Sequence, residues 1–431
     1  MKMNSIQKYP AYKNSGMEWL GEIPEHWEPM KLKHIFIEKK KKTNPTLNCG
    51  SISFGKVVTK DDEKIPLTTK ASYQEVLEGD FLINPLNLNY DLISLRIALS
   101  EIDVVVSSGY IVLNNRKEID KSYYKWLLHR YDVAYMKLLG SGVRQTINFN
   151  HIADSILAFP PIAEQTAIAN FLGNKTALID KAIALKEKQI ELLKERRQIL
   201  IHRAVTRGLN PDVNLKNSGV EWIGEIPEHW EVKVLRYIGK TQNGISKGAE
   251  YFGSGFPFVN YGDVYKDSTL PVNVVGLANS SEEDRRQYSV IKGDVFFTRT
   301  SETVEEIGFS SVCLQTIENA IFSGFLIRFR PTTGILDEKF SKYYFRSQTH
   351  RPFFVKEMNL VIRASLSQEL LKKMPVLLPP LIEQMAIAKY LDNTTTKIST
   401  AITLKEKEIE KLKEYKSVLI NEAVSGKIKV G

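Results

Sequence analysis

The amino-acid sequence predicts a mixed α/β chain in which two β-rich domains are separated by an antiparallel coiled coil of two long helices. Three observations predict this fold class. A long amphipathic segment occurs twice, a short segment rich in Gly and Trp occurs twice ahead of it, and a domain-sized stretch with short β-branched runs follows each short segment. The chain therefore has a pseudo-twofold internal repeat of domain, helix, domain and helix.

The composition is that of a folded chain with a basic surface. Its 431 residues are 43% hydrophobic, which is enough to build two or three domains. There are 59 Lys and Arg residues against 50 Asp and Glu, and the net charge of +9 favours a polyanionic partner without requiring one. Cys49 and Cys313 lie far apart and lack the spacing of a zinc site, so we expect neither a disulfide framework nor a metal centre.

Nothing in the sequence predicts a membrane or secreted protein. No apolar run reaches the ~18 residues of a membrane helix, and the N-terminal residues lack the apolar core of a signal peptide. We therefore expect a cytoplasmic protein.

The short repeated segments, called frame segments below, span residues 13–28 and 216–231. They are identical at 14 of 16 positions. Gly16, Gly21 and Pro24 predict an irregular segment held by aromatic residues, not a regular strand or helix.

A β-rich head follows each frame segment: head 1 spans residues 29–158 and head 2 spans residues 232–377. Strands are predicted at 81–83, 104–106, 110–113, 295–298 and 325–329, and helices at 121–139 and 338–357. The sequence GDFLIN at 79–84 matches GDVFFT at 293–298, and SSGYIVL at 107–113 matches FSGFLIR at 322–328. The heads are therefore predicted to share one fold with divergent contents. Each ends in a loop and a strand, 140–161 and 359–380, closed by two prolines.

The long helices are predicted from Glu164 to about Thr206 and from Glu383 onwards, where 20 of the first 32 residues are identical between the copies. A heptad count makes seven of ten seam positions of the first helix apolar. At ~1.5 Å per residue such a helix is about 65 Å long. Polar seam positions also recur, as Lys186 with Lys405 and Arg197 with Lys416. The apolar seam residues expected to pair are Leu172, Ile179, Ile183, Ile190, Leu193 and Leu200 in the first helix and Leu391, Ile398, Ile402, Ile409, Leu412 and Leu419 in the second. The alternative is that each helix packs only on its own head.

These assignments give six consecutive segments. They are a first domain at 1–163, the first long helix at 164–207, a linker at 208–215, a second domain at 216–382, the second long helix at 383–426 and a tail at 427–431.

The sequence resembles the specificity subunits of type I restriction–modification systems. The resemblance rests on the paired SGxEWxGEIPEHW frame segments, the R-[QA]-[TS]-[IL] loops at 144–147 and 363–366, the PPxxEQxAIAxxL stretches at 160–172 and 379–391, and the duplicated long helices. It implies two target recognition domains spaced by an antiparallel coiled coil. It also implies that the chain reads a bipartite DNA sequence, one half per domain, and recruits methyltransferase and restriction subunits without performing chemistry itself.

Candidate DNA-binding residues are the Arg, Asn, Gln, Ser, Thr and Lys side chains at strand exits and in Gly-flanked loops, where loops project from a rigid scaffold. For each Asn the alternative is a turn-forming role. The lysine run 39–42 could also follow phosphates, or form a solvated face. The candidates are Asn84, Asn87, Asn89, Arg144, Gln145 and Thr146 in head 1 and Lys247, Arg299, Thr300, Ser301, Arg363 and Ser365 in head 2.

The sequence contains no complete catalytic motif. The stretch INPLN at 83–87 lacks the second proline and the aromatic residue of an adenine methyltransferase, and no Walker loop is present. DDEK at 61–64 is interpreted as an exposed turn. His26 and His229 recur beside tryptophans, but we find no repeated carboxylate or nucleophile for them and interpret both as structural.

The resemblance also defines the partners. They are double-stranded DNA, two modification subunits and restriction subunits, with S-adenosylmethionine bound by the modification subunit and no cofactor on this chain. A scaffold whose two globular domains bind proteins is the alternative function, and a stand-alone enzyme is the third. Salt-dependent DNA affinity separates the first two hypotheses, and turnover by the isolated chain would identify the third.

Overall fold

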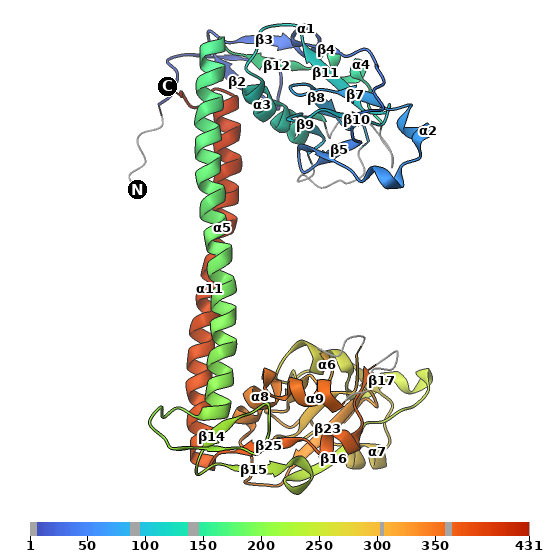
Figure 1. Ribbon diagram of the computed structural model, residues 1–431, viewed down its shortest axis with the longest axis vertical. Coiled ribbons are helices and arrows are strands. Elements are labelled where there is room, and N and C mark those ends of the chain that lie inside the picture. The colour runs from blue at the N-terminus through green and yellow to red at the C-terminus, as the bar shows by residue number, and fades with distance from the viewer. Residues whose placement is uncertain (1–6, 87–94, 137–145, 302–305, 358–363, 431) are drawn as a thin grey trace. The chain divides into compact units, whose positions relative to one another are not determined.

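Two long helices and two α/β heads make up the chain in a computed structural model that describes residues 7–86, 95–136, 146–301, 306–357 and 364–430 (Figure 1). Helix α5 spans Ile162–Arg207 and helix α11 spans Leu381–Val424. The chain divides into two compact units: unit 1 holds residues 1–186 and 407–431, and unit 2 holds residues 187–406. Each unit therefore contains one head, one frame segment and a part of each long helix.

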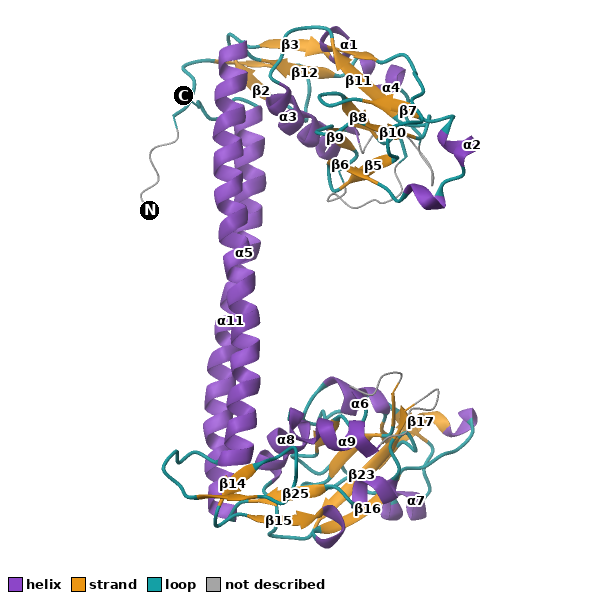
Figure 2. Ribbon diagram, viewed as in Figure 1, coloured by secondary structure: helices purple, strands orange, loops and turns teal. Residues whose placement is uncertain are grey.

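Head 1 is built on antiparallel strands (Figure 2). Its four-stranded sheet has the order β4 (Phe36–Glu38), β11 (Ile111–Asn115), β8 (Phe81–Ile83) and β9 (Ile97–Leu99). Two-stranded pairs join β7 (Gln74–Val76) to β10 (Val104–Val106), β5 (Gly50–Ser53) to β6 (Lys56–Thr59), and β3 (Glu28–Lys31) to β12 (Ile156–Phe159). The short helices are α1 (Leu32–Ile35), η1 (Asp62–Lys64), α2 (Leu67–Lys70) and α4 (Phe149–Ala153).

Helix α3 (Lys121–Ala134) packs on the sheet of head 1. Asp120 caps it by accepting a hydrogen bond from the backbone N–H of Tyr123 at 3.0 Å. Tyr124, Leu127, Leu128 and Tyr131 lie three or four residues apart and are buried, so they form the apolar face that a packed helix needs.

Head 2 repeats the sheet of head 1. Its four-stranded sheet has the order β16 (Gly239–Asn243), β23 (Leu326–Pro331), β19 (Val295–Thr298) and β21 (Ser310–Val312). The matched motifs GDFLIN and GDVFFT lie on β8 and β19, at the same place in the two sheets. The remaining strands are β15 (Glu231–Val234) with β25 (Pro375–Leu378), β17 (Phe252–Val259) with β18 (Leu277–Ala278) and β22 (Ile321–Phe322), and β20 (Thr300–Ser301) with β24 (Ala364–Ser365). The helices are η3 (Leu235–Tyr237), η4 (Ala249–Tyr251), α6 (Tyr261–Lys266), α7 (Glu282–Gln287), α8 (Glu338–Arg346), η6 (Gln348–His350), α9 (Arg351–Glu357) and α10 (Gln368–Lys372).

Several sequence expectations are corrected. The frame segments are not wholly irregular, because β1 (Tyr12–Asn14) pairs with β2 (Glu22–Pro24) and β13 (Leu215–Asn217) pairs with β14 (Glu225–Pro227). The stretch TQNGISKG at 241–248, which the sequence predicts to be a flexible polar loop carrying Lys247, begins in a strand, because residues 241–243 belong to β16.

The helix expected at 338–357 is broken. Helix α8 ends at Arg346, and Ser347 takes an extended backbone conformation and caps the next turn through its hydroxyl. Pro352 lacks the N–H that a continuous helix would bond to the carbonyl of Gln348, so a continuous helix is disfavoured. Helix α3 ends at Ala134, before the expected residue 139, and residues 137–145 lie outside the described part of the chain.

The long helices pair antiparallel within each unit. In unit 1, Asp180 bonds Lys416 at 2.7 Å and Lys186 bonds Glu408 at 2.6 Å, and in unit 2, Gln189 accepts a bond from Lys405 at 2.6 Å. The polar seam lysines thus reach across to acceptors on the opposite helix, which fixes the register. Among the predicted seam residues, Leu193, Leu200 and Leu412 are half-buried. The buried ones are Leu172, Ile179, Ile183, Ile190, Leu391, Ile398, Ile402, Ile409 and Leu419.

A glutamate at the start of each long helix joins that helix to its frame segment. Glu164 accepts hydrogen bonds from the indole N–H of Trp27 at 3.0 Å and from the hydroxyl of Tyr9 at 2.6 Å, and its other oxygen lies 2.6 Å from His26 Nε2. Burial alone would raise the pKa of Glu164, but these hydrogen bonds outweigh burial and lower it.

Unit 2 repeats this contact. Glu383 accepts from Trp230 Nε1 at 3.0 Å and lies 2.5 Å from His229 Nε2. The two histidines therefore do have a repeated carboxylate partner, which the sequence analysis missed because that partner lies far along the chain.

The glutamine that follows each glutamate joins the long helix to the head. Gln165 donates to Pro160 O at 2.8 Å and accepts from the backbone N–H of Asp120, the cap of α3, at 2.9 Å. Gln384 accepts in the same way from the backbone N–H of Asp337, the cap of α8, at 2.8 Å. We call each Glu-Gln pair with its partners a Glu-Gln junction.

Replacing Gln165 by Ala should loosen head 1 on its helix. The substitution leaves the buried carbonyl of Pro160 and the N–H of Asp120 without these partners, so unit 1 should lose about 1–3 kcal/mol of stability. Hydrogen exchange measured by mass spectrometry should speed up in peptides covering residues 118–131. Asn170→Ala, an exposed change on the same helix, is the matched control. Equal protection in both variants would contradict the role of the junction.

Candidate nucleic-acid interface

In head 1, two predicted DNA-contact loops come together. Leu86, just beyond strand β8, forms an antiparallel bridge with Thr146, and the backbone N–H of Ile147 donates to Pro85 O at 3.2 Å. Asn84 folds the exit of the strand, because its side-chain oxygen accepts from the N–H of Leu86 at 3.1 Å. The Asn84 side chain therefore has a turn-forming role, the alternative left open by the sequence.

Head 2 builds the same pair of loops. Thr300 pairs with Ser365 and Ser301 with Ala364, while the backbone N–H of Leu366 donates to Arg299 O at 2.7 Å. We call the joined segments 84–86 with 146–147, and 299–301 with 364–366, the bridged loops of heads 1 and 2. Backbone bonds hold both, so side chains at matching positions are free to differ.

The side chains at matching positions do differ. When GDFLIN at 79–84 is aligned with GDVFFT at 293–298, Pro85 corresponds to Arg299 and Leu86 to Thr300, and the bridging partner Thr146 corresponds to Ser365. The two heads therefore present different chemistry on one backbone scaffold.

Arg299 lies where three loops of head 2 meet. Its backbone N–H donates to Phe325 O at 3.0 Å, and its guanidinium lies 3.5 Å from Gly324 O. The N–H of Gly324 in turn donates to Ile245 O at 2.8 Å, two residues before Lys247. Lys247 is exposed, with its ammonium 5.9 Å from the centre of the Tyr251 ring. Phe325 is 62% exposed, so a large apolar side chain lies next to Arg299.

The lysine run of head 1 occupies the place of residues 243–246 in head 2. Lys39 hydrogen-bonds to Val112 of β11, and Asn243 pairs with Ile327, which is the matching residue of β23. Lys39 is engaged with Asp80 at 2.7 Å, and Lys41 donates to Ser108 O at 2.7 Å. Lys39 and Lys41 are therefore less available to phosphates than the sequence suggested.

Five predicted contact residues, Asn87, Asn89, Arg144, Gln145 and Arg363, lie outside the described residues. The same holds for the side chain of Ser301, whose backbone lies in β20. The structure thus brings together Asn84 with Thr146, and Arg299 and Thr300 with Ser365.

Sequence reasoning missed an exposed aromatic residue in head 1. Phe54 stands at the tip of the β5–β6 hairpin, 82% exposed, with a φ of 47° in the left-handed region. Gly55 has a φ of 72°, and a Cβ there would lie 2.7 Å from Leu95 Cδ1. Two-residue hairpin turns of this kind prefer Asn-Gly, so Phe54 costs stability while burying little surface. The run ISFGKVV, with one glycine between two β-branched stretches, was the available signal.

The acidic stretch 61–64 beside this hairpin has a structural role. Asp62 accepts from the backbone N–H of Cys49 at 2.7 Å and from Lys70 Nζ at 2.6 Å. The Lys70 and Cys49 hydrogen bonds lower the pKa of Asp62 to about 2. Among the described residues no group of His, Cys, Asp and Glu is arranged to hold a metal ion, and none of the described helices is long and apolar enough to span a bilayer.

Comparison with known families finds one match that covers most of the chain. The model described as "Type I restriction modification DNA specificity domain" matches residues 24–195 and again residues 227–414. Each match covers the end of a frame segment, a whole head and most of a long helix.

Similar sequences carry related names. The putative type I restriction enzyme MjaX specificity subunit of Methanocaldococcus jannaschii is 25% identical, over 95% of this chain and 96% of its own length. The MjaVIII specificity subunit of the same organism is 24% identical over 76% of this chain and 75% of its own length. The EcoKI specificity subunit of Escherichia coli is 27% identical over 55% of this chain and 50% of its own.

Two solved structures share the fold at 16% identity. One, from work on complex assembly and conformational transition of the type I R-M system, has a TM-score of 0.70 and covers 93% of this chain and 98% of its own. The other, the HsdS subunit from Thermoanaerobacter tengcongensis, has a TM-score of 0.56 and covers 94% of this chain and 98% of its own.

The strain at Phe54 leads to a stability prediction. Phe54→Asn should raise the stability of unit 1 by roughly 0.5–1 kcal/mol, because Asn tolerates the left-handed conformation that Phe resists. Urea unfolding would measure the change. Leu67→Asn, which alters an equally exposed apolar residue of head 1 in a right-handed helix, should change stability by less than about 0.5 kcal/mol. A less stable Phe54→Asn variant would show that the tip contributes to folding.

Proposed function

This chain belongs to the type I restriction–modification DNA specificity family, and from that membership we propose that it reads a two-part DNA target, one half-site with each head. The resemblance seen in the sequence is confirmed at the level of the family. Reading in two parts is the further step, and the geometry of the heads supports it.

One observation carries the proposal: both heads build the bridged loops on the same backbone bonds, with different side chains at matching positions. DNA sequence is read by side chains at base edges, whereas phosphate contacts set position. A repeated scaffold with divergent side chains suits two heads that read different half-sites. The net charge of +9 supports the phosphate contacts.

The contact residues proposed for head 2 are Arg299, Thr300, Ser365 and Lys247, with Phe325 as an apolar neighbour. For head 1 they are Asn84 and Thr146 together with Phe54, whose exposed ring suits an apolar contact with bases. The predicted residues Asn87, Asn89, Arg144, Gln145, Ser301 and Arg363 remain part of this proposal.

We propose no catalytic residue in this chain. Its partners in the proposal are two modification subunits, which bind S-adenosylmethionine, and restriction subunits, in a cytoplasmic complex. Exposed aliphatic side chains spaced seven residues apart on α5 support protein partners. They are Leu178 and Leu185 in unit 1 and Leu192 and Ile199 in unit 2. At the matching positions of α11, Lys397 and Lys411 replace two of them.

The same aliphatic side chains favour the alternative of a protein-binding scaffold. The two functions differ in how DNA affinity depends on salt. A DNA reader loses affinity steeply as salt rises, because phosphate contacts release counterions, whereas a scaffold has no such slope.

Exchanging head 2 tests reading in two parts. Residues 235–374, which lie between β15 and β25, would be replaced by the matching head of a relative with a different target. Methylated adenines would then be mapped across the genome of cells that express the chain with its modification subunit. We expect a bipartite motif of which only one half changes. A complex that assembles without producing any motif would favour the scaffold.

Arg299→Ala should relax reading by head 2. A well-placed arginine contact to a base contributes about 1–3 kcal/mol of discrimination, so affinity for the mapped target should fall while head 1's half of the motif is kept. Fluorescence anisotropy with substituted half-sites measures this. Arg236→Ala, an exposed arginine of η3 beside the frame, is the control. If Arg299→Ala, like the control, lowers affinity by the same factor for every half-site sequence, Arg299 contacts a phosphate instead of a base.

A further inference from the structure

In unit 1, a tyrosine closes the Glu-Gln junction. Tyr9 is only 7% exposed, and its hydroxyl donates to Glu164 Oε2 at 2.6 Å. Its ring centre lies 5.4 Å from that of His26 and 5.9 Å from that of Trp27. The phenol therefore has one strong acceptor and two aromatic walls.

In unit 2, His229 and Trp230 match these two aromatic walls, but no described tyrosine is bonded to Glu383. By the spacing of the frame segments, Asp212 stands at the position of Tyr9, and Asp212 is exposed. Glu383, His229 and Pro227 match Glu164, His26 and Pro24, and in unit 2 they line an open pocket of about 290 Å³ together with Ala386 and Ile387. Glu383 keeps its bonds to Trp230 and His229, and among the residues that the structure describes no tyrosine hydroxyl joins them.

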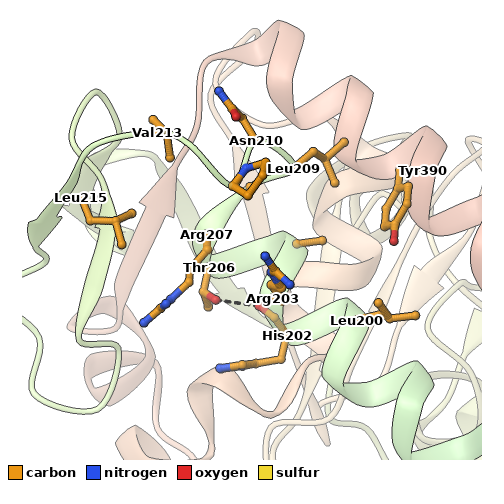
Figure 3. A pocket seen from close by; sticks show the side chains of 13 residues that line it. Leu200, His202, Arg203, Thr206, Arg207, Leu209, Asn210, Val213, Leu215 and Tyr390 are labelled. Atoms are coloured by element: carbon orange, nitrogen blue, oxygen red, sulfur yellow. Dashed lines mark hydrogen bonds between the residues drawn. The ribbon is translucent and has the colours of Figure 1, made fainter.

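A larger hollow of about 810 Å³ lies beside the end of α5 (Figure 3) and shares lining residues with this pocket. Arg207, Leu209, Asn210 and Val213 line both spaces. Arg203 and Arg207 add two cations to the lining, and both are exposed. No ion pair joins either arginine to another described residue.

We propose that this pocket of unit 2 binds the tyrosine side chain of a partner protein, in a segment with acidic residues beside the tyrosine. The phenol would donate to Glu383 as Tyr9 donates to Glu164, and its ring would lie against His229, Pro227 and Ile387. Carboxylates on either side would face Arg203 and Arg207. The pocket is independent of DNA reading, since none of its residues belongs to the bridged loops.

The internal repeat supplies the test. With the full-length chain, p-cresol, a free analogue of the tyrosine side chain, should bind at one site in calorimetry or ligand-observed NMR. Tyr9→Ala should open the matching space in unit 1 and raise the number of sites to two. Tyr9→Phe keeps the ring in place and should leave one site, which makes it the matched control. Asp212→Tyr should fill the pocket of unit 2 from within the chain and weaken p-cresol binding at least tenfold.

Two results would overturn the proposal. One is a wild-type chain that binds no p-cresol while Tyr9→Ala binds one molecule, because the pocket of unit 2 would then be closed to phenols. The other is unchanged p-cresol affinity in Asp212→Tyr, because the probe would then lie elsewhere. Circular dichroism of each variant confirms folding, and Asp212→Tyr changes an exposed position, so the test does not depend on Tyr9→Ala alone.

Peptide probes test the charge of the partner segment. Acetyl-Asp-Tyr-Asp-amide should displace p-cresol from the wild-type chain at a concentration at least fivefold lower than acetyl-Lys-Tyr-Lys-amide. The preference should vanish in the Arg203→Ala, Arg207→Ala double variant. Equal competition by the two peptides, or a preference that survives the double variant, contradicts the acidic segment. Both probes report on unit 2 whether or not the chain binds DNA.

Discussion

The Glu-Gln junction is the constraint on which the rest of each unit depends. Consecutive helix residues point about 100° apart, so the Glu164 carboxylate reaches the frame segment while the Gln165 amide reaches the cap of α3. A single turn of the long helix thereby fixes two separate elements. Glu383 and Gln384 do the same in unit 2. Since both side chains are bonded at their charged or polar ends, either one is costly to replace.

This arrangement separates what must stay constant from what can vary. The junction and the bridged loops depend on a few polar side chains and on backbone hydrogen bonds, such as Ile147 N–H to Pro85 O and Leu366 N–H to Arg299 O. Backbone bonds tolerate almost any side chain, so Pro85 and Arg299 occupy the same place in the two heads. Recognition chemistry can diverge there without disturbing the sheets that support it.

Local periodicity predicted the long helices and their buried seam, because heptad spacing is a property of neighbouring residues. It could not predict that Glu164 meets His26, since that contact joins residues far apart in the chain. The loops around Arg299 and Ser365 were each predicted from glycine, polar and strand signals, but their pairing through β20 and β24 depends on the tertiary fold. Phe54 escaped notice because turn positions are usually polar; the glycine in ISFGKVV indicates the turn, and the φ and exposure of Phe54 place that residue at its tip.

The division of the chain into units has a consequence for synthesis on the ribosome. Unit 2 is one continuous stretch, residues 187–406, and can complete its core as soon as it emerges. Unit 1 begins first but includes residues 407–424, whose Leu419 and Ala423 are buried in it, and Tyr123 bonds Val424 O at 3.0 Å. Part of the apolar surface of head 1 therefore stays uncovered until the second helix is finished. A chain that has emerged as far as residue 406 but not yet to residue 424 leaves head 1, not head 2, exposed to proteases.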